Sequence, residues 1–100
     1  GPLFAAECES DVNFEGVNHI STFSSSEWAE RGFCQVCGTH LFYRLKQEGH
    51  YAIPVGLFNG GDQWSLTEQI FIDQKPPFYS FTQKTKDLTG EEVFAQYSEK

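Results

Sequence analysis

Four phenylalanines recur at nearly regular intervals in the first half of the chain. Phe14, Phe23, Phe33 and Phe42 lie nine, ten and nine residues apart. The sequences that flank them do not match, so the pattern is not an internal repeat. Such spacing is typical of short strands joined by turns. We therefore expect a succession of short strands, each of which places one ring in a shared core.

Several segments have the composition of strands. Residues 12–16 alternate apolar and polar side chains, and residues 69–73 form a short apolar run between polar residues. The turn formers Gly, Asn and Asp cluster between such segments and predict tight turns. Three further β-rich segments cover 20–23, 39–45 and 51–58, and the expected turns cover 47–49 and 59–62.

One helix is signalled near the C-terminal end. Thr89 and Glu92 have the spacing of a capping box, in which each side chain hydrogen-bonds the backbone N–H of the other residue. Val93, Phe94 and Tyr97 then form an apolar face. The predicted fold class is therefore mainly β with one short C-terminal helix, in a single domain over residues 1–100.

The charge balance and the lengths of the apolar runs each exclude one class of partner. Seven Lys and Arg face fourteen Asp and Glu, a formal net charge of −7, and no basic stripe is present to neutralise phosphates. We therefore expect no nucleic-acid partner. No apolar run reaches the length of about 18 residues that a membrane span needs, so we expect no membrane partner.

The cysteine count bears on the compartment. Three cysteines are an odd number and too few for a disulfide-stapled secreted domain. The first residues lack the basic region of a signal peptide and soon become acidic. A cytoplasmic protein with reduced thiols is the expectation.

The most informative motif is Cys34-x-x-Cys37-Gly38, which has the form of a zinc knuckle. The two-residue gap lets both thiolates face one metal, and the glycine lets backbone amides turn towards sulfur. A redox motif needs a helix after the first cysteine, whereas a strand is expected here, so we disfavour it. His40 is either a third metal ligand or a strand residue, and Cys8 fits a small core side chain.

Residues 25–46, SSEWAERGFCQVCGTHLFYRLK, resemble the second half of the glutathione-dependent formaldehyde-activating enzyme family, which includes centromere protein V. The resemblance continues through 51–58, 69–73 and 75–78, and it covers nearly the whole chain. It implies a β-tent fold with two zinc ions. In the family a structural zinc is held by an N-terminal Cys-x-Cys pair and a later Cys-x-x-Cys, and a catalytic zinc by a Cys-x-Cys-x-x-Cys cluster.

Only part of that ligand set has a counterpart here. Cys34 and Cys37 match the later half of the structural site, and nothing matches the N-terminal pair or the catalytic cluster. The resemblance therefore implies an incomplete zinc site and no catalytic residue in this chain. Gln69 stands where many members have His. Residues 1–6 look like the segment that follows the catalytic cluster, and Gly1-Pro2 fits a protease-site scar equally well. With no Met in the chain, we expect a domain incomplete at its N-terminus.

Three functions stay open. The resemblance implies a carbon–sulfur lyase that adds the glutathione thiol to formaldehyde, giving S-hydroxymethylglutathione. The alternative is a non-catalytic module that binds a protein, or a small ligand such as glutathione or a small thiol adduct. A fragment with no independent role is the third. We expect a homodimer, because missing strands would leave sheet edges exposed, and a two-fold axis could unite two copies of Cys34 and Cys37 around one zinc.

Overall fold

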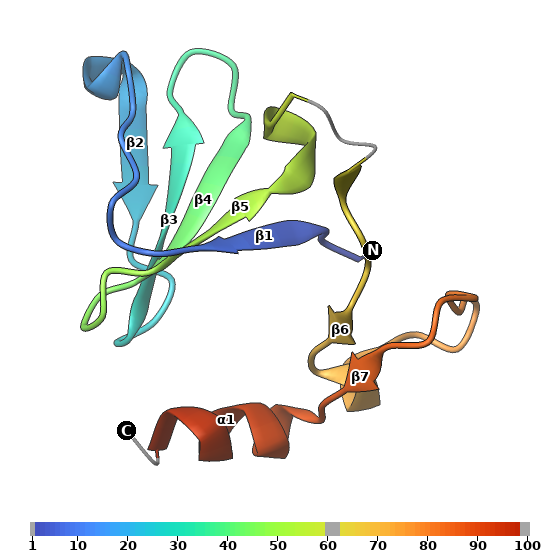
Figure 1. Ribbon diagram of the computed structural model, residues 1–100. Helices are drawn as coiled ribbons and strands as arrows, with labels where there is room; N and C mark the ends of the chain where they lie inside the picture. The colour runs from blue at the N-terminus through green and yellow to red at the C-terminus, as the bar shows by residue number, and fades with distance from the viewer. Residues whose placement is uncertain (1, 60–62, 99–100) are drawn as a thin grey trace. The chain divides into compact units, whose positions relative to one another are not determined.

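The computed structural model describes residues 2–59 and 63–98, and it is mainly β with one short C-terminal helix, as predicted (Figure 1). The chain forms two compact units, Gly1–Asp62 and Gln63–Lys100, and each is described by itself. The expectation of a single domain over residues 1–100 stays a prediction.

An antiparallel sheet of five strands makes up the first unit, in the order β1-β5-β4-β3-β2 (Figure 1). Strands β2 to β5 follow one another in the chain and pair with their sequence neighbours, whereas β1 joins the far edge beside β5. The strands are β1 (Ala5–Cys8), β2 (Ile20–Phe23), β3 (Ala29–Cys34), β4 (His40–Leu45) and β5 (Tyr51–Pro54).

Three aromatic rings form the centre of this unit. The rings of Phe42 and Tyr51 lie 5.1 Å apart, and Phe14 packs 5.2 Å from Phe42 and 5.7 Å from Tyr51. The Phe42 ring also covers Gly32 on the neighbouring strand, where an added Cβ would lie 2.2 Å from the ring. Glycine is thus required at this position for the ring to reach the sheet. Phe42 is 5% exposed, and Ala29 of β3 is fully buried.

The strand predictions are partly confirmed. The segments at 20–23 and 39–45 match β2 and β4, and the turn at 47–49 is present, with Gly49 at a φ of 72°. The segment at 51–58 is a strand only to Pro54 and continues as a 3-10 turn, η2 (Val55–Leu57). The turn predicted at 59–62 lies largely outside the described residues.

Two expectations about the first unit are wrong. Residues 12–16 form no strand, because Gly16 adopts a left-handed φ of 68° and the segment turns into η1 (Val17–His19). Phe14 still reaches the core, as expected. Phe23 does not, because its side chain is 63% exposed.

The second unit is built around a parallel strand pair and the helix. Its strands are β6 (Glu68–Gln69) and β7 (Lys86–Asp87), and a 3-10 turn, η4 (Ile72–Gln74), follows β6. The strand predicted at 69–73 ends early because Phe71 adopts a left-handed φ of 53°. Leu88 and Val93 are 6% and 7% exposed and supply the apolar contacts.

The helix α1 (Gly90–Ser98) begins with the predicted capping box. The backbone N–H of Thr89 donates to Glu92 Oε1 at 3.0 Å, and the backbone N–H of Glu92 donates to Thr89 Oγ1 at 3.2 Å. A third cap comes from η4, where Asp73 Oδ1 accepts the backbone N–H of Gly90 at 2.8 Å. A carboxylate at this position also faces the positive end of the helix dipole.

Replacing Gly32 with alanine should destabilise the protein by about 1–3 kcal/mol, because the new methyl group overlaps the Phe42 ring. Urea unfolding followed by circular dichroism measures the change. Gly56→Ala is the matched control, since a Cβ at Gly56 meets no atom within 4 Å. Equal losses in the two variants would contradict the role of Gly32.

Asp73 should make α1 sensitive to acid. The hydrogen bond from the Gly90 N–H holds the pKa of the Asp73 carboxyl below its ordinary value of 3.8. A pKa that is lower in the folded than in the unfolded chain stabilises the fold above pH 3.8, and that stabilisation is lost as the pH falls through the folded pKa. A carboxyl titration by NMR should give a midpoint below 3.8. Asp73→Asn, which keeps an acceptor oxygen, should flatten the acid dependence of α1, and an unchanged dependence would refute the assignment.

Candidate functional site

The Cys34–Cys37 segment forms a tight turn between β3 and β4. Two backbone hydrogen bonds close it, from Cys34 N–H to the Thr39 carbonyl at 2.9 Å and from Gly38 N–H to the Cys34 carbonyl at 2.7 Å. Gly38 has a φ of 80°, a left-handed conformation that favours glycine. The Cys34–Cys37 segment is therefore a turn between two strands, as the sequence predicted, and its binding of zinc stays a prediction.

Gln35 fixes this turn to the neighbouring edge of the sheet. Its backbone N–H donates to the His19 carbonyl at 2.9 Å, and its side-chain Nε2 donates to the Asn18 carbonyl at 2.9 Å. The hydroxyl of Ser21 donates to Gln35 Oε1 at 3.1 Å. Three hydrogen bonds thus hold one residue of the turn, and they orient the two cysteines relative to η1 and β2.

The turn stabilises a thiolate at Cys37. The Cys37 Sγ lies 3.1 Å from Thr39 Oγ1. Hydrogen bonds from the Thr39 hydroxyl, then from the Thr39 backbone and from the Cys34 thiol, lower the pKa of the exposed Cys37 thiol. The thiolate is the form that binds metals and attacks electrophiles. The two sulfurs therefore form a candidate site for a thiophilic metal.

His40 and Cys8 lie apart from this pair. His40 is a residue of β4 opposite Phe33, and burial, followed by the charge of Arg31, lowers its pKa. Its Nε2 is buried and has no hydrogen-bond partner among the described residues. Cys8 is on β1, three strand spacings or about 14 Å from β3. Burial raises the pKa of the Cys8 thiol, with Asp11 adding to the effect.

Within residues 2–59 and 63–98, no three His, Cys, Asp or Glu side chains stand together so that they could hold a metal ion. None of the helices in these residues has the length and apolar composition of a membrane-spanning segment. The described turn therefore supplies two sulfur ligands, and a tetrahedral zinc site needs four ligands.

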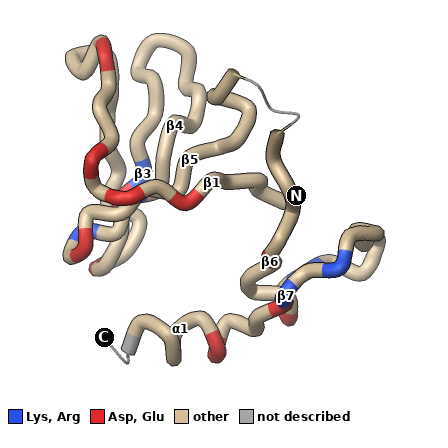
Figure 2. The backbone as a smooth tube through the Cα atoms, in the orientation of Figure 1, with Lys and Arg blue, Asp and Glu red and all other residues tan. Residues whose placement is uncertain are grey.

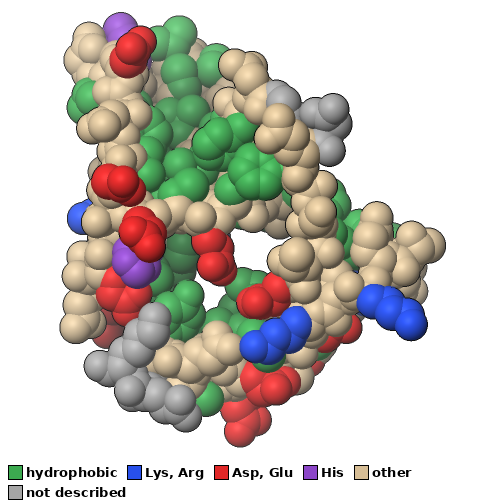
Figure 3. Space-filling model, in the orientation of Figure 1, with side chains coloured by type: hydrophobic (Ala, Val, Ile, Leu, Met, Phe, Trp, Pro, Cys, Tyr) green, Lys and Arg blue, Asp and Glu red, His purple; other side chains and the backbone are tan. Residues whose placement is uncertain are grey.

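Two valines near the cysteine turn are exposed. Val36, between the two cysteines, is 76% exposed, and Val17 of η1 is 65% exposed. In Figure 3 hydrophobic side chains are visible over the upper part of the sheet of the first unit. Figure 2 shows the acidic and basic positions along the backbone, and the fourteen acidic residues outnumber the seven basic ones. The turn thus adds exposed apolar side chains to a surface that also carries the polar side chains of Gln35 and Thr39.

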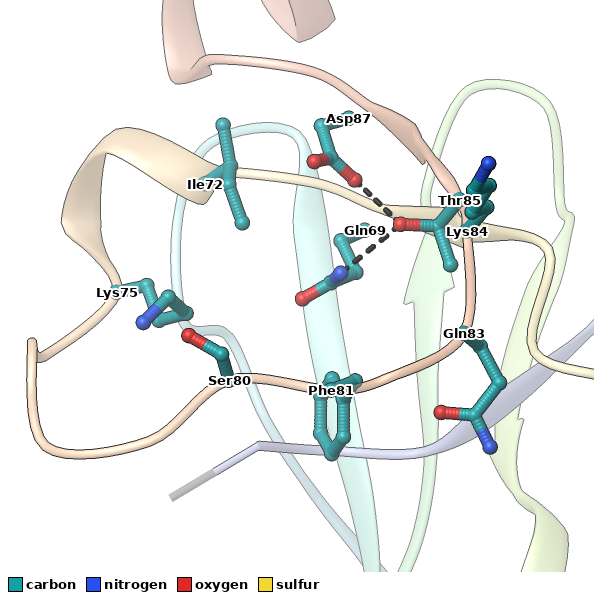
Figure 4. Close-up of a pocket in the computed structure, with 9 residues that line it drawn as sticks. All are labelled: Gln69, Ile72, Lys75, Ser80, Phe81, Gln83, Lys84, Thr85 and Asp87. Carbon is teal, nitrogen blue, oxygen red and sulfur yellow. Dashed lines mark hydrogen bonds between the residues drawn. The ribbon is translucent and has the colours of Figure 1, made fainter.

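The second unit contains an open cavity of about 560 Å³, shown in Figure 4. Its wall includes strand residues, the η4 turn and the segment that leads into β7, and its volume is typical of small-molecule sites. The sequence did not predict this cavity. The strands β6 and β7 beside it are each two residues long and lie 17 or more residues apart in the sequence. It is lined by Gln69, Ile72, Lys75, Ser80, Phe81, Gln83, Lys84, Thr85 and Asp87.

Comparison with known proteins gives one informative match. No family model and no solved structure matches it. Over 93 residues it is 33% identical to a Schizosaccharomyces pombe protein named as an uncharacterized lyase. The match covers 92% of this chain and 68% of that protein. The chain therefore belongs to the same lyase family as the yeast protein.

The two types of cysteine should differ in reactivity. With a chelator present, we expect iodoacetamide to modify Cys37 before Cys8 at neutral pH, since only the Cys37 pKa is lowered and its side chain is exposed. Thr39→Val should slow the Cys37 reaction, and Thr39→Ser, which keeps the hydroxyl, should restore it. Mass spectrometry of the modified peptides measures both rates. Equal rates at Cys8 and Cys37 would contradict the assignment.

Proposed function

We propose that this protein acts with a low-molecular-weight thiol as a carbon–sulfur lyase of the glutathione-dependent formaldehyde-activating type. Two findings support the proposal. The chain belongs to a lyase family, and its Cys34–Cys37 turn presents two sulfurs, one of them with a lowered pKa. The turn is the observation that carries the assignment, because it supplies half of the structural zinc site that the resemblance implies.

The proposed reaction forms and breaks one carbon–sulfur bond. The glutathione thiolate attacks the carbonyl carbon of formaldehyde, and a carbon–sulfur bond forms. The π electron pair moves to the carbonyl oxygen, which takes up a proton to give S-hydroxymethylglutathione. The reverse reaction cleaves the same bond and needs no oxidant or reductant. A zinc ion, when bound near the thiol, favours its thiolate form.

The role of Cys34 and Cys37 in this proposal is structural. Their sulfurs would hold zinc in a tetrahedral site, and two further ligands would come from a second copy of the chain or from another polypeptide segment. The exposed Val36 and Val17 beside the turn favour a second copy, since apolar surface around the cysteines would be buried in a dimer. The cytoplasmic location stays a prediction.

A non-catalytic binding module is the second candidate. The observation that favours it is the open cavity of the second unit, which has the volume of a small-molecule site. In that case the protein would hold glutathione, a small thiol adduct or another small ligand without turning it over.

Metal content and native mass, measured together on protein purified without chelator, test the proposal. One zinc per dimer is expected for a site that two copies share, and two zinc ions per chain would favour the full enzyme. Cys34→Ser and Cys37→Ser should each abolish zinc binding, while Cys8→Ser, on β1 three strands away from β3, should leave it intact.

Activity is measured as loss of formaldehyde in the presence of glutathione. Turnover that stops on removal of zinc would support the lyase proposal. A protein that binds no zinc and shows no turnover would contradict it and favour the binding module.

A further inference from the structure

The polar wall of the second unit's cavity contains two consecutive hydrogen bonds. Gln69 donates to Thr85, and Thr85 donates in turn to Asp87. Gln69 and Asp87 are direct partners in the β6–β7 pair, so their side chains lie on the same face. Gln69 Nε2 donates to Thr85 Oγ1 at 2.9 Å, and the Thr85 hydroxyl donates to Asp87 Oδ1 at 2.5 Å (Figure 4). The Thr85 hydroxyl thereby uses its hydrogen and fixes the orientation of the Gln69 amide.

An acceptor oxygen remains at each end of this pair of hydrogen bonds. Gln69 Oε1 and the second carboxylate oxygen of Asp87 accept no hydrogen bond from the described residues. In Figure 4 the Gln69 oxygen points towards the interior of the cavity. Two acceptors that flank one hydroxyl are suited to a ligand group with several N–H donors, such as a primary ammonium.

The cavity also has positive charge at its rim. Lys75 is occupied by its own loop, since its Nζ donates to the carbonyls of Pro76 and Tyr79 and lies 4.7 Å from the centre of the Tyr79 ring. Lys84 is exposed and has no hydrogen bond or ion pair with the described residues. Its long stem is flexible, so its ammonium can turn to a carboxylate at the rim.

Ile72 and Phe81 supply the apolar part of the wall, on opposite sides of the opening in Figure 4. The wall thus combines an acceptor pair, a mobile cation and two apolar side chains. We propose that this cavity binds a free α-amino acid with an apolar side chain. Its ammonium donates to Gln69 and Asp87, and its carboxylate faces Lys84. The site lies in the second unit and does not rest on the sulfur chemistry of the Cys34–Cys37 turn.

Three probes distinguish the contribution of the ligand's ammonium to binding from that of its carboxylate. Norleucine carries both charges, pentylamine is its decarboxylated analogue, and hexanoate is its deaminated analogue. Each is titrated into the ¹⁵N-labelled full chain and followed by NMR. We expect saturable shifts within residues 69–87 and none at the cysteine turn. Norleucine should bind at least about tenfold more tightly than hexanoate, because hexanoate lacks the ammonium that makes the charge-assisted hydrogen bond. It should bind about threefold more tightly than pentylamine, since an exposed ion pair is worth less.

Charge-removing variants give a second, independent test. Asp87→Asn should weaken norleucine and pentylamine but leave hexanoate unchanged. Lys84→Gln should weaken norleucine and hexanoate but leave pentylamine unchanged. Lys86→Gln is the matched control: Lys86 pairs with Glu68 in the register of β6 and β7 and does not line the cavity. A well-dispersed spectrum of each variant establishes that it is folded.

Several results would overturn the proposal. These are equal affinity for all three probes, equal effects of Lys84→Gln and Lys86→Gln, or shifts spread over both units. The absence of any saturable shift up to about 50 mM norleucine would also overturn it. None of these results bears on zinc binding or lyase activity, so this proposal and the lyase proposal can fail separately.

Discussion

The first unit depends on the contact between the Phe42 ring and Gly32 on the adjacent strand. The missing side chain at Gly32 lets the ring lie against the backbone, where it meets Phe14 and Tyr51. That contact holds β3 and β4 together, and the cysteine turn is the connection between these two strands. The orientation of the candidate metal ligands therefore depends on this packing contact as well as on the hydrogen bonds that close and anchor the turn.

The elements that the sequence predicted are those with a local physical signal. β2 and β4 are rich in β-branched and aromatic residues, and α1 begins at a capping box made by Thr89 and Glu92. β1 and β3, with sequences AAEC and AERGFC, contain mostly residues of low β-propensity, and only pairing with neighbouring strands makes them extended. The left-handed φ of Phe71, which ends β6, has no local signature in the sequence.

Of the two candidate sites, one has a local signal in the sequence and the other does not. The cysteine turn was predictable because its ligands and its glycine are within five residues of one another. The cavity was not, since Gln69 and Thr85 are 16 residues apart in the sequence and meet only through the pairing of β6 with β7. Spacing in a sequence reveals sites made by one turn, whereas sites made by the tertiary fold need the fold itself.

The three hydrogen bonds of Gln35 link the cysteine turn to η1 and to the start of β2. β2 is an edge strand of the described sheet, with a partner on one side only. These hydrogen bonds join the candidate ligands to the edge at which a further strand would pair. If a ligand at the sulfurs stiffened this edge, reciprocity would require that a strand paired at the edge change the affinity at the sulfurs by the same factor.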